Sequence, residues 1–280
     1  MKKRIVSLLL AAALLTGAAS AAGEESTAEH PDLDLSAASA VLMEKETGSL
    51  LYEKESHQQL EPASVTKVMT LLLIMEDLDS GRLSKEDLVT VSAAAAGMGG
   101  SQVYLKEGEQ FSAGELIKCI AVVSGNDAAV AMAEHLAGSE AAFVERMNRR
   151  AQELGMKDTV FVNCTGLPAA GHHSSAYDIA LMSRELILHH PDIRTYTTIW
   201  MDSIRDGAFG LTNTNRLVRF YPGATGLKTG STDSALYCLS ATAERDGMEL
   251  IAVVMKAPSS AHRFGDAKAL LDYGFSAWSL

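Results

Sequence analysis

The sequence predicts a mixed α/β (α+β) fold, in which one antiparallel sheet is built from both ends of the chain and a mainly helical region is inserted between them. Strand-like patterns occur before residue 55 and after residue 224, whereas residues 65–189 carry helical patterns. The composition, 47% hydrophobic and 21% charged, is typical of a globular protein. A chain of 280 residues is long enough to bury a sizeable core.

Two hairpins supply most of the predicted sheet, because paired apolar runs flank a glycine-containing turn near each end of the chain. The turns contain Thr47-Gly48 and Asp246-Gly247. The strands are expected at Ala40–Met43, Leu50–Tyr52, Leu236–Ala243 and Leu250–Met255.

The longest apolar run of the folded region, Val65–Leu78, predicts a buried helix. It follows Pro62, a residue favoured at helix starts, and stops at Ser80-Gly81. A helix that is apolar on all sides has to be buried. Further helices are expected at residues 113–123, 126–136, 139–154, 175–189 and 263–275, the first of them with a capping box formed by Ser112 and Glu115.

The first 21 residues have the features of a secretory signal peptide. Lys2, Lys3 and Arg4 precede the apolar run Ile5–Leu15, and Ala19-Ser20-Ala21 offers a small-residue cleavage site. We therefore expect the protein to be exported to the extracytoplasmic space, whether secreted, at the cell wall or in a periplasm.

The remaining chain is expected to divide into a short lead-in and one folded domain. Residues 22–36 are acidic and lack periodicity, which indicates a flexible lead-in, and the domain is expected over residues 37–280. No later segment is apolar and long enough to span a bilayer.

Charge and cysteine content exclude several kinds of function. A net charge of −11 disfavours a nucleic-acid partner. The three cysteines, Cys119, Cys164 and Cys238, lack metal-binding spacing, and their odd number leaves at least one unpaired within the chain. We predict no metal and no other cofactor, and nothing in the sequence demands a disulfide.

Ser64-Val65-Thr66-Lys67 is the first of three short motifs that each occur once. Side chains at positions i and i+3 of a helix lie on the same face, so Ser64 and Lys67 should be neighbours. A serine hydroxyl is a weak nucleophile and needs a base, which Lys67 can supply only when uncharged. Burial and a second cation nearby, for which Lys228 is the candidate, would lower the pKa of Lys67. Taken alone, the pair is more simply a capping serine and an unrelated lysine.

The second motif, Ser124-Gly125-Asn126, falls between two predicted helices. The Ser124 hydroxyl could pass a proton from Lys67 to a leaving group. The Asn126 amide could hold a substrate carbonyl or the lysine itself. The simpler alternative is a loop in which Asn126 caps the helix that follows.

The third motif, Lys228-Thr229-Gly230, is expected within a strand that starts after Tyr221-Pro222-Gly223. A glycine in a strand often permits close approach of a ligand, and a lysine beside a hydroxyl suits a carboxylate. The simpler alternative is an edge-strand lysine followed by a turn.

Together and in this order, the three motifs resemble the penicillin-recognising serine enzymes, and within them the low-molecular-mass D-alanyl-D-alanine carboxypeptidases. The resemblance covers the chain from about Ala37 to Trp278 and implies the β-lactamase/DD-peptidase-like fold. It extends to Glu61–Ser64, Gly99–Val103, Ser124–Ala128, Asn213–Asn215, Tyr221–Gly223 and Arg263–Ala267.

The resemblance implies that the first two motifs carry the chemistry. Ser64 is expected to attack the carbonyl of the penultimate D-alanine, and Lys67 to take its proton. Ser124 is expected to relay that proton toward the departing D-alanine, and Asn126 to orient the substrate.

The third motif is expected to bind the substrate. Lys228 and Thr229 would receive the terminal carboxylate, beside Gly230. The backbone N–H groups of Ser64 and Ser231 would form an oxyanion hole, which stabilises charge that appears only in the transition state. Relatives often have an aromatic residue or a histidine where this chain has Ser231, but the oxyanion hole needs only the backbone.

The implied substrate is a peptidoglycan stem peptide ending in D-Ala-D-Ala, and β-lactams are expected to acylate Ser64. Many relatives continue into a β-rich domain and an amphipathic anchoring helix. This sequence stops where the peptidase domain ends, so we expect no C-terminal β-rich domain and do not predict membrane anchoring.

Two alternatives stay open. A serine β-lactamase shares the acylation machinery, but class A enzymes use a glutamate for deacylation, and residues 127–227 contain no E-x-x-L-N. The peptidase is therefore favoured. The other alternative is a non-catalytic penicillin-binding or sensor module on the same fold.

Overall fold

The computed structural model describes residues 33–278. The predicted signal peptide, residues 1–21, and most of the predicted lead-in, residues 22–36, lie outside the described residues. Leu35, near the end of that lead-in, is buried, and its carbonyl accepts a hydrogen bond of 2.6 Å from Lys54 Nζ.

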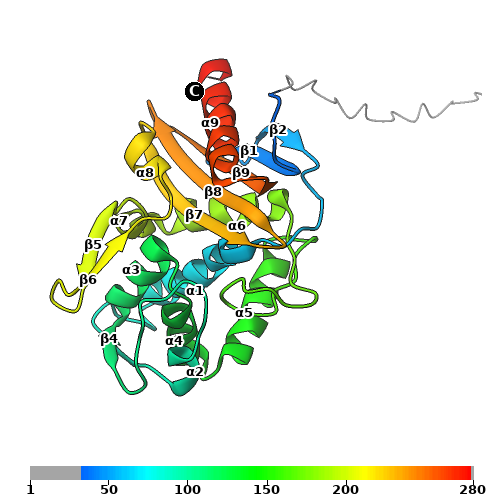
Figure 1. The fold of residues 1–280 in the computed structure, drawn as a ribbon. Coiled ribbons are helices and arrows are strands. Elements are labelled where there is room, and N and C mark those ends of the chain that lie inside the picture. Colours follow the sequence, from blue (N-terminus) through cyan, green and yellow to red (C-terminus); the bar gives the residue numbers. More distant parts are fainter. Residues whose placement is uncertain (1–32, 279–280) are drawn as a thin grey trace, which may run out of the picture.

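A five-stranded antiparallel sheet forms the centre of the fold and takes strands from both ends of the chain (Figure 1). The strand order is β2-β1-β9-β8-β7, so that β1 pairs directly with β9. The strands are β1 Ser39–Glu44, β2 Leu50–Lys54, β7 Ala224–Thr232, β8 Leu236–Arg245 and β9 Met248–Ala257. The predicted fold class and both predicted hairpins are confirmed.

The sheet separates two cores because successive side chains of a strand point to opposite faces. In β9, Leu250 and Ala252 pack on one face, together with helix α9 (Ser260–Ala277), whereas Ile251 and Val253 pack on the other. The core that contains Ile251 and Val253 extends into the helical region. Helix α6 (Ala176–His189) of this region lies against β1 and β9.

The helical region lies between the two groups of strands, as predicted, and the capping box of Ser112 and Glu115 is present. Its main helices are α1 Lys67–Asp79, α3 Ala113–Val123, α4 Asn126–Ala137, α5 Glu140–Glu153 and α6. The shorter helices are α2 Ala93–Ala96, η2 Pro191–Ile193, α7 Arg194–Thr197 and α8 Leu217–Phe220. Two small antiparallel sheets pair β3 Leu88–Thr90 with β4 Gln110–Ser112 and β5 Met201–Ile204 with β6 Phe209–Thr212.

The start of the buried helix differs from the prediction. A 3₁₀ helix, η1 (Ala63–Thr66), comes first, and α1 begins at Lys67 rather than at Val65. Tight 3₁₀ turns are common at the N-terminal ends of α-helices, and they eclipse side chains three residues apart. The first motif therefore bridges η1 and α1, and its serine and lysine still lie on one side of the chain.

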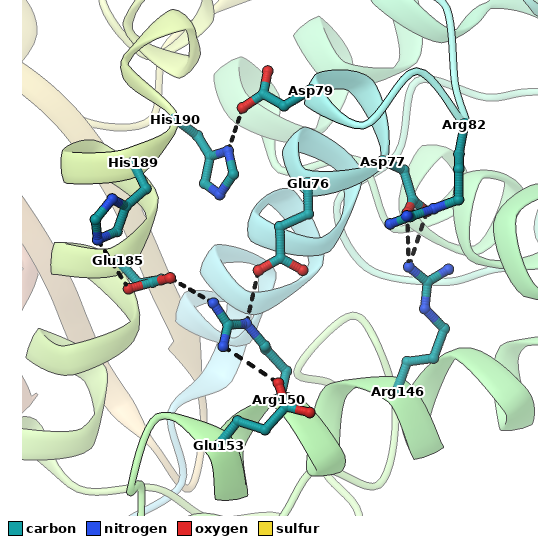
Figure 2. Close-up of polar contacts among 10 residues, drawn as sticks. All are labelled: Glu76, Asp77, Asp79, Arg82, Arg146, Arg150, Glu153, Glu185, His189 and His190. Atoms are coloured by element: carbon teal, nitrogen blue, oxygen red, sulfur yellow. Dashed lines mark hydrogen bonds and ion pairs between the residues drawn. The ribbon is translucent and has the colours of Figure 1, made fainter.

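A network of ion pairs fixes the C-terminal half of α1 to its neighbours α5 and α6 (Figure 2). The buried carboxylate of Asp77 pairs with Arg146 at 2.9 Å. Arg150 reaches Glu76 at 2.7 Å and Glu185 of α6 at 2.5 Å. A buried carboxylate such as Asp77 requires partners of this kind, so the network holds α1 in a defined position.

All three cysteines are buried, and none forms a disulfide within residues 33–278. In the same part of the chain, no group of three or more histidine, cysteine or acidic residues is arranged to hold a metal ion. None of the helices described is both long and apolar enough to cross a bilayer.

Candidate active site

The fully buried amine of Lys67 is the centre of the candidate site. Its Nζ donates hydrogen bonds to Ser64 Oγ at 3.0 Å, to Asn126 Oδ1 at 2.6 Å and to the Thr165 carbonyl at 2.7 Å. Burial lowers the pKa of Lys67 to about 7, because a charged amine is disfavoured away from water. Near neutral pH a large fraction of the molecules therefore carries an uncharged amine beside the Ser64 hydroxyl.

Two glycines allow other segments to approach the backbone of Ser64 closely. Gly166 has φ +84°, and a Cβ there would lie 1.9 Å from the Ala63 carbonyl oxygen. A Cβ on Gly230 of β7 would lie 2.9 Å from the Ser64 nitrogen. Only glycine fits at either position, so the loop 163–167 and β7 both pack directly against η1.

Ser124 and Asn126 lie at the junction of α3 and α4. The N-cap of α4 is Gly125, so Asn126 does not cap this helix. Asn126 Nδ2 donates to the Gly99 carbonyl at 2.7 Å, and Asn126 Oδ1 accepts a hydrogen bond from Lys67. Ser124 ends α3 in the left-handed conformation, with φ +66°. Its buried Oγ has no hydrogen-bond partner within residues 33–278, which costs about 1–3 kcal/mol. The capacity of this hydroxyl for hydrogen bonding is therefore unused within the described residues.

Strand β7 brings Lys228 close to Lys67. Lys228 is buried, and its Nζ donates to the Thr229 carbonyl at 2.9 Å. Burial, and then the nearby charge of Lys67, hold the pKa of Lys228 well below its usual range. Burial is the main cause of the lowered pKa of both amines. Repulsion between two positive charges disfavours the charged form of each, so the expected effect of Lys228 on the pKa of Lys67 stays a prediction.

Only some of the predicted site residues are hydrogen-bonded to one another in the described part of the chain. Ser64, Lys67 and Asn126 form one hydrogen-bonded group, and Gly230 lies against its backbone. In the described part of the chain, the side chains of Ser124, Lys228 and Thr229 make no hydrogen bond to that group, and Ser231 is exposed next to Gly230.

Several groups at the site were not identified from the sequence. Thr214 accepts a hydrogen bond of 2.7 Å from Thr229 Oγ1. Arg263, in the first turn of α9, donates from Nη1 to the Gly230 carbonyl at 3.1 Å, and its charge contributes to the lowered pKa of Lys228. Both residues lie in segments that carry the family resemblance, and that resemblance was the signal that could have identified them.

His172 contacts η1 through a hydrogen bond to Thr66. Val162 N donates to its Nδ1 at 3.0 Å, so Nε2 carries the proton and donates to Thr66 Oγ1 at 2.8 Å. Burial lowers the pKa of His172 to about 4, which keeps the ring neutral.

Comparison with known proteins identifies the family. Residues 24–259 match the family described as D-alanyl-D-alanine carboxypeptidase. The Bacillus subtilis D-alanyl-D-alanine carboxypeptidase DacF is 48% identical over 99% of this chain and 72% of its own length. Two crystal structures share the fold. DacD from Francisella tularensis has a TM-score of 0.84 and 32% identity, covering 88% of this chain and 72% of its own. Ampicillin-bound penicillin-binding protein D2 from Listeria monocytogenes has a TM-score of 0.80 and 34% identity, covering 88% of this chain and all (100%) of its own. The chain therefore belongs to the D-alanyl-D-alanine carboxypeptidase family.

Proposed function

We propose that this protein removes the terminal D-alanine from peptidoglycan stem peptides through an acyl-enzyme on Ser64. The observation that carries the proposal is the contact of 3.0 Å between the Lys67 amine and the Ser64 hydroxyl, together with the pKa of about 7 for that amine. A hydroxyl beside an amine that is partly uncharged at neutral pH is a competent nucleophile and base.

Acylation begins when the uncharged Lys67 takes the Ser64 proton and Ser64 Oγ attacks the carbonyl carbon of the penultimate D-alanine. The oxyanion that forms accepts hydrogen bonds from the N–H groups of Ser64 and Ser231. The proton then moves from Lys67 through Ser124 to the departing amine as the peptide bond breaks. The unpartnered Oγ of Ser124 supports this relay.

The substrate lies along β7. This strand is at the edge of the sheet, so an extended peptide can pair with its free side (Figure 1). Lys228 and Thr229 receive the terminal carboxylate, in a region made more positive by the nearby Arg263. Asn126, which holds Lys67, also orients the substrate amide.

Water hydrolyses the acyl-enzyme and regenerates Ser64. β-Lactams acylate the same hydroxyl, a proposal supported by the ampicillin-bound relative from Listeria monocytogenes. The domain over residues 37–280 carries this activity, and we place its action outside the cytoplasm after export by the segment 1–21.

The test is release of D-alanine from a diacetylated Lys-D-Ala-D-Ala tripeptide by the purified protein, measured beside the turnover of a chromogenic β-lactam. We expect D-alanine release and a β-lactam adduct that turns over slowly. Rapid β-lactam turnover without D-alanine release would instead favour a serine β-lactamase. Absence of both reactions would favour the non-catalytic module.

A further inference from the structure

An open pocket of about 410 Å³ lies at the end of the candidate site where η1 begins. It is lined by Glu61, residues 168–171, His172 and His173. The lining loop continues directly from the segment 163–167 that packs against Ser64. Its size is within the range of pockets that bind small ligands or side chains.

The pocket and the carboxylate-binding end of the site lie on opposite sides of Ser64 along β7. On one side of Ser64, Thr229 of β7 donates a hydrogen bond to Thr214. On the other side, Ser234, which follows β7, donates a hydrogen bond to Glu61. Glu61 precedes Ser64 by three residues, so their Cα atoms are at most about 11 Å apart. A peptide whose terminal carboxylate lies near Thr229 therefore extends its preceding residues toward Glu61.

Glu61 is the charged group of this pocket. Both ring nitrogens of the neutral His172 are engaged in hydrogen bonds, and His173 Nδ1 donates to the Gly171 carbonyl at 2.8 Å. The loop from Pro168 to Gly171 offers small apolar surfaces. A carboxylate at the edge of such a pocket suits a cation on a long methylene stem, which can bury the stem and leave the charge partly in water.

We propose that this pocket is a specificity subsite, in which Glu61 binds the side-chain amine of the residue that precedes the two D-alanines. This subsite rests on the proposed function, because the direction of the bound peptide follows from the acyl-enzyme chemistry at Ser64.

The experiment compares two tripeptides, Nα-acetyl-Lys-D-Ala-D-Ala with a free side-chain amine and the same peptide with that amine acetylated. The measured quantity is the ratio of their kcat/KM values for D-alanine release. We expect the wild-type protein to prefer the free amine about fivefold, as for a partly exposed charge pair, and to lose part of that preference at high salt. Glu61→Gln reduces the ratio to about one.

Ser234→Ala is the matched control, because it removes the hydrogen bond to Glu61 but leaves its charge. This variant is expected to keep the wild-type ratio. Equal rates for both peptides in the wild type, or an unchanged ratio in Glu61→Gln, would overturn the subsite and leave the carboxypeptidase assignment intact. Absence of D-alanine release from either peptide would overturn the proposed function and the subsite with it.

Discussion

Replacing Lys67 by alanine lowers the rate of Ser64 acylation by up to about 10⁴-fold, the expected loss when a positioned general base is removed. The amine is the group that lies within hydrogen-bond distance of Ser64 Oγ, at 3.0 Å. In the described residues Ser124 Oγ has no partner at all, so it does not replace the base in the resting site. The measurement is the time course of labelling by a fluorescent penicillin, followed on a denaturing gel.

The Lys67→Arg variant tests whether residue 67 acts as a base or only as a positive charge. A guanidinium keeps the charge and the donors but does not lose its proton in a protein. The arginine variant should therefore be as slow as the alanine variant. Acylation of Lys67→Ala near the wild-type rate would assign the base to another group. Circular dichroism controls for folding, since Asn126 Oδ1 and the Thr165 carbonyl lose a buried donor, at about 1–3 kcal/mol each.

Ser64→Ala abolishes the covalent penicillin adduct and lowers D-alanine release by at least about 10⁴-fold, because the atom that forms the acyl bond is gone. The loss should exceed that of Lys67→Ala, since a hydroxyl without its base still reacts slowly. The backbone that positions residue 64 is held by contacts with Gly166 and Gly230, which the substitution leaves in place.

Ser80→Ala is the matched control for Ser64→Ala, because Ser80 caps the opposite end of α1. It should retain labelling and D-alanine release. An adduct of undiminished amount on Ser64→Ala, mapped by mass spectrometry to Ser124 or another residue, would contradict the assignment of the nucleophile.

Patterns that repeat along a segment made much of the fold predictable. Apolar runs around Thr47-Gly48 and Asp246-Gly247 identified both hairpins, and the largely apolar segment Val65–Leu78 identified the buried helix α1. The order of the three motifs then indicated which segments of these elements meet.

The contacts that position the site could not be predicted in the same way. Backbone carbonyls of Thr165 and Gly99 bind Lys67 and Asn126, but every residue has a carbonyl, so the sequence carries no signal for them. The loop of Gly166 packs against the Ala63 carbonyl at the start of η1, and such a long-range contact leaves no local pattern in the sequence.

The extent to which burial lowers the pKa of the two lysines also could not be predicted from the sequence. The pKa of a buried amine depends on how completely it is removed from water, and that is known only once the surrounding segments are in place. Lys67 and Lys228 are both buried, and burial is the main cause of the lowered pKa of each.

The pH dependence of Ser64 acylation most directly addresses whether an uncharged Lys67 is the base. Because the amine works only when deprotonated and its pKa is about 7, the acylation rate constant should be level above about pH 8 and fall about tenfold for each pH unit well below 7. A rate constant that stays the same from about pH 5 to pH 9, in a protein that remains folded throughout, would contradict a neutral lysine as the base.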